Sequence, residues 1–181
     1  MAFARPRKLF TEAELYEYAV GALARRSRSV AELKRLLRNR VEADTEFGRT
    51  LVELIIVRLK DQGYLNDARY AAAYSSYRRD TEKFGRIRVV SDLKAKGVHG
   101  EVIARAVDSA YEEVEEEELA RAYLKRKRLK KPKDQKEAAR IFRNLRRAGF
   151  ESRTIFTILK KWDVDEETLG ALDEEAPEIS G

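Results

Sequence analysis

Cysteine is absent from all 181 residues, and several classes of protein are excluded with it. Neither a disulfide framework nor a zinc site built on thiolates can form without cysteine sulfur. The absence suits a reducing compartment and predicts a cytoplasmic protein. Long apolar runs are missing as well, and the basic residues near the N-terminus precede no signal-peptide core, so no membrane partner is expected.

Histidine is limited to His99, which lies in a glycine-flanked segment. A single imidazole without clustered cysteines or carboxylates provides neither a metal site nor a base for a nucleophile, so we interpret His99 as a loop or helix-cap residue. Phosphate-binding loops are missing too, because Gly85 is followed by Arg-Ile-Arg and not by Gly-Lys-Ser/Thr. These absences predict a protein that is not an enzyme and that binds neither a cofactor nor a metal.

The acidic run of residues 112–118 is open to two interpretations. A Mg²⁺ or Ca²⁺ site needs converging oxygens, whereas adjacent glutamates point in all directions around a helix. Acids near a helix N-terminus are stabilised by the helix dipole. We therefore favour the start of a helix over a metal site.

Capping signals predict where the first helices begin. Thr11 and Ser29 are each followed three residues later by glutamate, which is the pattern of a capping box. A third helix is predicted from Asp44 or Thr45 to Gly63, since glycine readily ends a helix. The apolar run at 54–57 predicts that this helix is buried on two sides. Its predicted core stripe consists of Phe47, Leu51, Leu54, Ile55 and Leu59.

The stretch of residues 63–98 is the template of an internal repeat. Asn66 occupies the position of a helix N-cap, and Gly97 that of a glycine that ends a helix. Residues 93–98, Leu-Lys-Ala-Lys-Gly-Val, match residues 145–150, Leu-Arg-Arg-Ala-Gly-Phe, 52 residues further along the chain. Because apolar positions on both sides follow the same offset, the match indicates repeated helical units.

These helix signals, together with the absence of β-hairpin turns, predict an all-α protein. We expect nine helices in three tandem three-helix repeats, forming an elongated array that is either straight or curved. The acids and Pro177 of the C-terminal tail predict disorder, although the tail could instead fold over the third repeat as a weak mimic of DNA. The predicted parts are a basic N-terminal arm (1–10), repeat 1 (11–65), repeat 2 (66–111), repeat 3 (112–162) and the acidic tail (163–181).

The net charge of +6 conceals a strong segregation of charge along the chain. Residues 121–161 carry 16 Lys and Arg against three acids, whereas residues 163–181 carry eight acids and no base. Such a field favours a polyanionic partner for the basic part.

Three segments are distinctive when taken together. They are residues 24–33 (Ala-Arg-Arg-Ser-Arg-Ser-Val-Ala-Glu-Leu), residues 63–71 (Gly-Tyr-Leu-Asn-Asp-Ala-Arg-Tyr-Ala), and residues 85–98, from Gly-Arg-Ile to Leu-Lys-Ala-Lys-Gly-Val. The residues of these segments, their order and their spacing resemble those of the RecX family, the bacterial regulators of the RecA recombinase. Asn66 stands where that family often has Asp, and the acidic tail lies outside the resemblance.

The resemblance implies three tandem three-helix repeats that bind in the groove of the RecA filament on single-stranded DNA. It also implies inhibition of strand exchange, ATP hydrolysis and coprotease activity, within DNA repair, DNA recombination and the SOS response. The leading hypothesis is therefore a non-enzymatic inhibitor of RecA that works as a monomer. Its partners would be the RecA filament and single-stranded DNA, with double-stranded DNA left open.

The alternative is a sequence-nonspecific nucleic-acid-binding helical protein that acts without RecA. In that case Tyr70, Tyr74 and Tyr77 could stack on bases, although amphipathic aromatics are more often packing residues. In both hypotheses exposed bases make the contacts, and each of them could equally belong to a solvated helix face. The candidate residues are Arg25, Arg26, Arg28, Arg35, Arg38, Arg86, Arg88, Lys125, Arg126, Lys127, Arg128, Arg140, Arg143, Arg146 and Arg147.

Overall fold

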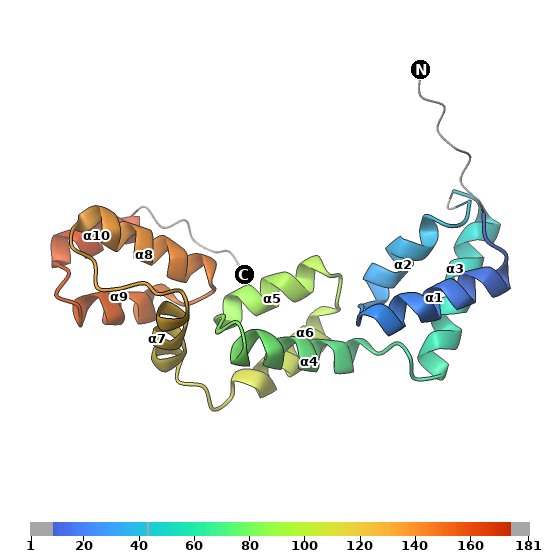
Figure 1. The fold of residues 1–181 in the computed structure, drawn as a ribbon, viewed down its shortest axis with the longest axis horizontal. Helices are drawn as coiled ribbons and strands as arrows, with labels where there is room; N and C mark the ends of the chain where they lie inside the picture. The colour runs from blue at the N-terminus through green and yellow to red at the C-terminus, as the bar shows by residue number, and fades with distance from the viewer. Residues whose placement is uncertain (1–8, 43, 175–181) are drawn as a thin grey trace, which may run out of the picture. The chain divides into compact units, whose positions relative to one another are not determined.

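The computed structural model describes residues 9–42 and 44–174, and the regular structure in these ranges is entirely α-helical (Figure 1). The predicted all-α class and three-helix units are confirmed, and a tenth helix follows the nine expected. The helices are α1 (Glu12–Arg25), α2 (Val30–Arg38), α3 (Glu46–Asp61), α4 (Asp67–Asp80), α5 (Arg86–Ala95), α6 (Gly100–Tyr111), α7 (Glu116–Arg126), α8 (Gln135–Arg147), α9 (Ser152–Lys160) and α10 (Glu166–Glu174).

The chain divides into two compact units. Unit 1 comprises residues 1–71 and 93–103, and unit 2 comprises residues 72–92 and 104–181. The middle repeat, α4 to α6, therefore contributes residues to both units.

The core of unit 1 lies between the facing sides of α1, α2 and α3. Leu15, Leu37 and Ile55 come from the three helices in turn, and each is fully buried. Burial of side chains of this size stabilises a fold by about 1.5–3 kcal/mol each. The period-3.6 spacing of these residues is the reason that short, highly charged helices can share one core.

The core of unit 2 is centred on α7, α8 and α9. Leu145, Phe150 and Ile155 are fully buried there. Aromatic rings of the middle repeat join this core, since the ring of Phe84 lies 5.9 Å from that of Tyr123. Such a distance is typical of attractive aromatic pairs.

Side chains at the helix starts behave as the sequence predicts. Thr11 and Ser29 both complete capping boxes. The side-chain oxygen of Thr45 accepts a backbone N–H at 3.0 Å and begins α3. Asn66 Oδ1 accepts the N–H of Arg69 at 2.9 Å, which confirms Asn66 as a cap.

The start of α2 meets the glycine turn that ends α5 within unit 1, and we call this contact the Ser29 junction. Ser29 Oγ donates to the Lys96 carbonyl at 2.6 Å, and Lys96 Nζ lies 3.3 Å from the carboxylate of Glu32. Gly97 has a φ of 72°, the left-handed conformation that favours glycine. A Cβ at Gly97 would lie 2.5 Å from the Cβ of Ala31, so the approach is close as well.

The start of α5 meets the glycine turn that ends α8 within unit 2, and we call this contact the Gly85 junction. The N–H of Gly85 donates to the Ala148 carbonyl at 2.8 Å, and that of Ile87 to the Gly149 carbonyl at 3.3 Å. Gly149 has a φ of 90°, and a Cβ there would lie 2.2 Å from the Arg88 nitrogen. Carbonyls at the end of α8 therefore accept hydrogen bonds from amides at the start of α5. This contact also places the negative end of the α8 dipole beside the positive end of the α5 dipole.

The predicted burial of α3 on two sides is wrong. Leu54 is 49% exposed and Val57 is 53% exposed, and Phe47, which was expected in the core stripe, is 77% exposed. Helices α1 and α2 both pack on the opposite side of α3, where Ile55 and Leu59 are fully buried. Four consecutive apolar residues span more than half of a helix circumference, so one packed side cannot bury all of them.

The predicted disorder of residues 163–181 does not hold for residues 166–174, which form α10. Asp165 Oδ1 accepts the Thr168 N–H at 2.7 Å and starts the helix. Leu169 and Leu172, three residues apart on one face, are buried in the core of unit 2. Residues 175–181, and residues 1–8 of the predicted basic arm, lie outside the described residues.

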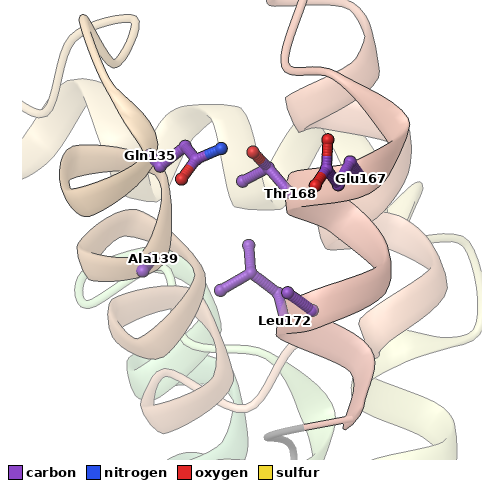
Figure 2. A pocket seen from close by; sticks show the side chains of 6 residues that line it. Gln135, Ala139, Glu167, Thr168 and Leu172 are labelled. Carbon is purple, nitrogen blue, oxygen red and sulfur yellow. The ribbon is translucent and has the colours of Figure 1, made fainter.

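The contact between α8 and α10 leaves a shallow pocket of about 230 Å³ (Figure 2). Figure 2 shows Gln135 and Ala139 on one wall and Glu167, Thr168 and Leu172 on the other. Small-molecule sites are commonly about 300–1,000 Å³, so this pocket is small for a ligand site. None of the helices in residues 9–42 and 44–174 is both long enough and apolar enough to cross a bilayer.

Candidate nucleic-acid and filament interface

Four basic side chains lie in a row along the exposed face of α8, and we call them the α8 stripe: Lys136, Arg140, Arg143 and Arg147. Their spacing of four, three and four residues places them on one side of the helix. From the first to the last the helix rises about 16 Å, a length over which one strand of B-DNA carries about five phosphates. Among the described residues no carboxylate pairs with any of the four, so their charges are available to a partner.

A second group of bases ends α7, at Lys125, Arg126, Lys127 and Arg128. Arg126 pairs with Glu82 at 3.3 Å, whereas the other three have no carboxylate partner in the part of the chain that the structure describes. Cations at a helix C-terminus are stabilised by the dipole, so part of this cluster serves the helix itself.

The arginines at the start of α5 are largely neutralised within the protein. Arg86 pairs with Asp108, and Arg88 Nε lies 2.9 Å from the Asp92 carboxylate. Arg146 also differs from its neighbours on α8, because it is half-buried and lies off the α8 stripe. A phosphate would have to compete with Asp108 for Arg86 and with Asp92 for Arg88. Arg86, Arg88 and the less accessible Arg146 are therefore weaker candidates for phosphate contact than the α8 stripe.

The structure does not gather the arginines of repeat 1 into one cluster. Arg25 and Arg26 end α1, and Arg26 lies 3.9 Å from the Glu32 carboxylate. Arg28 is half-buried, and its Nε is buried without a hydrogen-bond partner among the described residues. Arg35 and Arg38 are exposed near the other end of α2. The group is therefore spread over both ends of α2, a helix of nine residues and about 13.5 Å.

Two of the three α4 tyrosines are half-buried and hydrogen-bonded within the protein. Tyr70 donates its hydroxyl hydrogen to Glu32 at 3.3 Å, and Tyr74 donates to Asp92 at 3.0 Å. Burial and the nearby Asp92 carboxylate raise the pKa of Tyr74 to about 12, so this hydroxyl remains a donor. Tyr77 is 55% exposed and is the member of the three that a base could stack on.

Acids of the run 112–118 occupy the first turn of α7, as the sequence predicts. Glu116 accepts from the backbone N–H of Glu151 at 3.1 Å and from the Thr154 hydroxyl, and so supports the start of α9. Hydrogen bonds from Lys161 and Arg121 hold the pKa of Glu117 below its ordinary value. These carboxylates therefore connect the start of α7 to both ends of α9 within repeat 3.

Acids that follow repeat 3 pair with lysines outside the α8 stripe. Asp163 lies 2.6 Å from Lys131, whose hydrogen bond holds the pKa of this carboxyl below its ordinary value. Glu166 lies 3.6 Å from Lys160. No described acid of the tail pairs with the α8 stripe. The hypothesis that the tail imitates DNA stays a prediction, because residues 175–181 lie outside the described residues.

The exposed apolar side of α3 is a feature that sequence reasoning assigned to the core. The signal that could have found it is the helical wheel of residues 54–57. Leu54 and Val57 lie on the side opposite Val52 and Leu59, so packing on one side leaves them outside.

The fold and its basic faces define a tandem three-helix repeat protein. Residues 66–107 match the family model described as RecX, second three-helix domain. The regulatory protein RecX of Myxococcus xanthus is 34% identical over 132 residues, which cover 69% of this chain and 70% of that protein. The regulatory protein RecX of Leptothrix cholodnii is 33% identical over 145 residues, covering 80% of this chain and 87% of that protein. This chain belongs to the RecX family.

The crystal structure of RecX from Lactobacillus salivarius has a similar fold. Its TM-score is 0.65 at 22% sequence identity, and the alignment covers 84% of this chain and 96% of that one. A second crystal structure, of a regulatory protein RecX, has a TM-score of 0.62 at 23% identity. This chain therefore shares its helical fold with both of these structures.

Proposed function

We propose that this chain is a non-enzymatic inhibitor of RecA that binds in the groove of the RecA–single-stranded DNA filament. Bound there, it restrains strand exchange, ATP hydrolysis and coprotease activity during DNA repair and the SOS response. We further propose that it acts as a monomer in the cytoplasm. Membership of the RecX family supports the partner, and the α8 stripe is the observation that supports contact with a DNA-containing groove.

Physical reasoning connects the stripe to a filament that contains DNA. Its side chains are exposed, regularly spaced and without internal carboxylate partners among the described residues. Each phosphate that a Lys or Arg neutralises releases counterions, and this release favours binding. An inhibitor that holds both DNA and recombinase would oppose the filament movements that strand exchange requires.

A titration of RecA ATPase activity on single-stranded DNA tests the proposal. We expect this protein to lower the steady-state rate at fewer than one molecule per RecA subunit, because one bound repeat protein can restrain several subunits. No change in rate at equimolar protein would contradict the proposed inhibition.

The contribution of the stripe is measured with the double variant Arg143→Glu and Arg147→Glu. We expect that the double variant needs at least about tenfold more protein than the wild type for the same inhibition of RecA ATPase activity. Circular dichroism should show unchanged helicity. The matched control is Lys94→Glu with Arg153→Glu, which changes the net charge equally at exposed residues outside the α8 stripe and the other candidate residues. Equal loss in both variants would assign the effect to overall charge and not to the stripe.

A second candidate function is binding to nucleic acid without RecA. It is favoured by the α8 stripe, whose bases have no carboxylate partner among the described residues, and by the exposed Tyr77. Affinity for naked and RecA-coated single-stranded DNA distinguishes the two functions. Preference for the filament supports the RecA regulator, and equal affinity supports the second candidate. Replacing Arg143 and Arg147 by Ala should reduce the slope of log affinity against log salt by about 1.4 on single strands, at roughly 0.7 per contact.

A further inference from the structure

The outward face of α3 is apolar where a solvated helix is normally polar. Phe47, Leu54 and Val57 are 77%, 49% and 53% exposed. Their spacing of seven and three residues places them on one side of the helix. Val52 and Leu59 are buried on the side that packs in unit 1. The exposed apolar residues therefore share one side of the helix, with the exposed Thr50 between Phe47 and Leu54, and we call this side the α3 face.

The repeat itself does not need this apolar face. The third helices of the other two repeats are α6 and α9. Their exposed positions carry small or charged side chains, such as Ala104, Arg105 and Asp108 on α6 and Arg153 and Lys160 on α9. Exposure of large apolar side chains to water is unfavourable, so the gathering of three of them on α3, and of none on α6 or α9, indicates a partner.

Acidic residues border the α3 face and restrict what that partner can be. Glu46, Glu53 and Asp61 lie along the exposed side of the helix. The exposed bases Arg49 and Lys60 lie further round the helix from the apolar residues than Glu46 and Asp61 do. Lys34 pairs with Glu53 at 2.7 Å, and the Arg58 guanidinium lies 4.1 Å from the centre of an α1 tyrosine ring. Glu46 and Asp61 have no cationic partner among the described residues. Carboxylates at the rim repel phosphates, so this face is unsuited to nucleic acid.

We infer that the α3 face is a protein-docking surface for a partner with an apolar centre and a basic rim. Apolar residues at the centre and complementary charges at the rim are the usual anatomy of protein interfaces. The inference rests on the proposed function, under which this partner surface belongs to a RecA subunit. The chain then separates its two contacts: the α3 face binds protein, and the α8 stripe binds the DNA within the same filament.

The test removes the apolar side chains without changing charge. Phe47→Gln, Leu54→Gln and Val57→Gln are combined in one full-length protein, since all three positions are exposed and glutamine maintains a helix. Binding is measured to RecA-coated single-stranded DNA and to the same oligonucleotide without RecA. We expect about 10–100-fold weaker binding to the filament and unchanged binding to naked DNA.

Matched proteins make each outcome decisive. Leu9→Gln removes another exposed apolar side chain, 47% exposed, outside α3 and should leave both affinities unchanged. Filament affinity that is equal for the wild type and the triple variant would overturn the assignment of the α3 face while leaving the proposed function intact. Equal losses on filament and naked DNA would overturn the separation of protein and DNA contacts.

Two further outcomes would point to a different partner for the α3 face. A wild-type protein that binds naked DNA but shows no preference for the filament would overturn the proposed function itself, and the RecA assignment with it. Sedimentation that shows a wild-type dimer and a monomeric triple variant would instead assign the α3 face to a second copy of this chain. A monomeric wild type with selective loss on the filament supports the inference.

Discussion

The Ser29 junction and the Gly85 junction have the same plan but use different chemistry. In each, the second helix of one repeat begins against the glycine turn that ends the second helix of the next repeat. Side chains make the contact at Ser29, whereas backbone groups and glycines make it at Gly85. A repeat protein can therefore preserve a junction geometry while different residues supply the hydrogen bonds.

The difference follows from the residue at the start of each helix. Ser29 is a fully buried polar residue whose hydroxyl both caps α2 and reaches the Lys96 carbonyl. Gly85 has no side chain, so the main chains approach directly, and a Cβ there would lie 2.2 Å from the Gly149 oxygen. The first arrangement can be adjusted by side-chain changes, and the second cannot.

The largest expected effect is that of Gly149→Ala. The new Cβ would meet backbone atoms of α5, and alanine would also be forced into the left-handed region. Together these should lower the free energy of unfolding by about 3 kcal/mol or more. Urea denaturation followed by circular dichroism measures the loss.

Gly63→Ala is the matched control for Gly149→Ala. Gly63 has a φ of 75°, but a Cβ there would have no neighbour within 4 Å. Only the conformational cost of about 1 kcal/mol is expected. Similar losses at the two glycines would show that the Gly85 junction can open without cost, which contradicts the close approach.

An intermediate effect is expected for Gly97→Ala, where the new Cβ would meet the side chain of Ala31. We expect a loss of about 2 kcal/mol from strain and crowding. The double variant Gly97→Ala with Ala31→Gly removes the crowding, so its loss should be about 1 kcal/mol smaller than the sum of the single losses. If the losses of unfolding free energy in the two single variants simply added in the double variant, the side chains at positions 97 and 31 would not be in steric conflict.

The smallest effect is a dependence on pH that only the Ser29 junction should show. Burial works against the Glu32 carboxylate, but the Ser29 N–H and Lys96 overcome this and hold the pKa of Glu32 below its ordinary value of 4.5. A carboxylate with a lowered pKa stabilises the folded state above its ordinary pKa, and this contribution disappears as the pH falls through the lowered value. Stability supplied by Glu32 should therefore be present at pH 6 and reduced at pH 3.5.

The variant Glu32→Gln isolates this contribution in urea denaturation at several pH values. Its difference in unfolding free energy from the wild type should shrink as the pH falls below 4.5. The difference between the wild type and Gly149→Ala should stay constant over the same range, because the Gly85 junction is formed by the backbone. If the differences in unfolding free energy of Glu32→Gln and Gly149→Ala from the wild type changed equally with pH, the two junctions would not differ in their pH dependence.

Much of the fold could be predicted because its signals are local. Capping boxes at Thr11 and Ser29, the cap at Asn66 and the glycine at Gly97 act within one or two turns of helix. Short-range hydrogen bonds depend on neighbours in the sequence, so reading the sequence locates them. The α8 stripe was predictable for the same reason, since Arg140, Arg143 and Arg147 recur at helical spacing.

The rest of the candidate site depended on partners far away in the sequence. Arg86 and Asp108 are on different helices, and no local pattern indicates that they pair. The burial of Leu169 likewise depends on the surface that α8 and α9 present to α10. The acidic composition of residues 163–181 predicted disorder, because composition carries no information about contacts between residues far apart in the sequence.

The sequence by itself determined where the capped helices of the three repeats begin, their repetition after 52 residues, and the row of bases on α8. Each of these is a property of residues a few positions apart. Only the tertiary structure decided which apolar residues are buried, leaving Leu54 and Val57 exposed on α3, and which arginines are neutralised. Burial and ion pairing depend on the atoms that neighbouring helices bring close, and the helical period of a single segment does not contain that information.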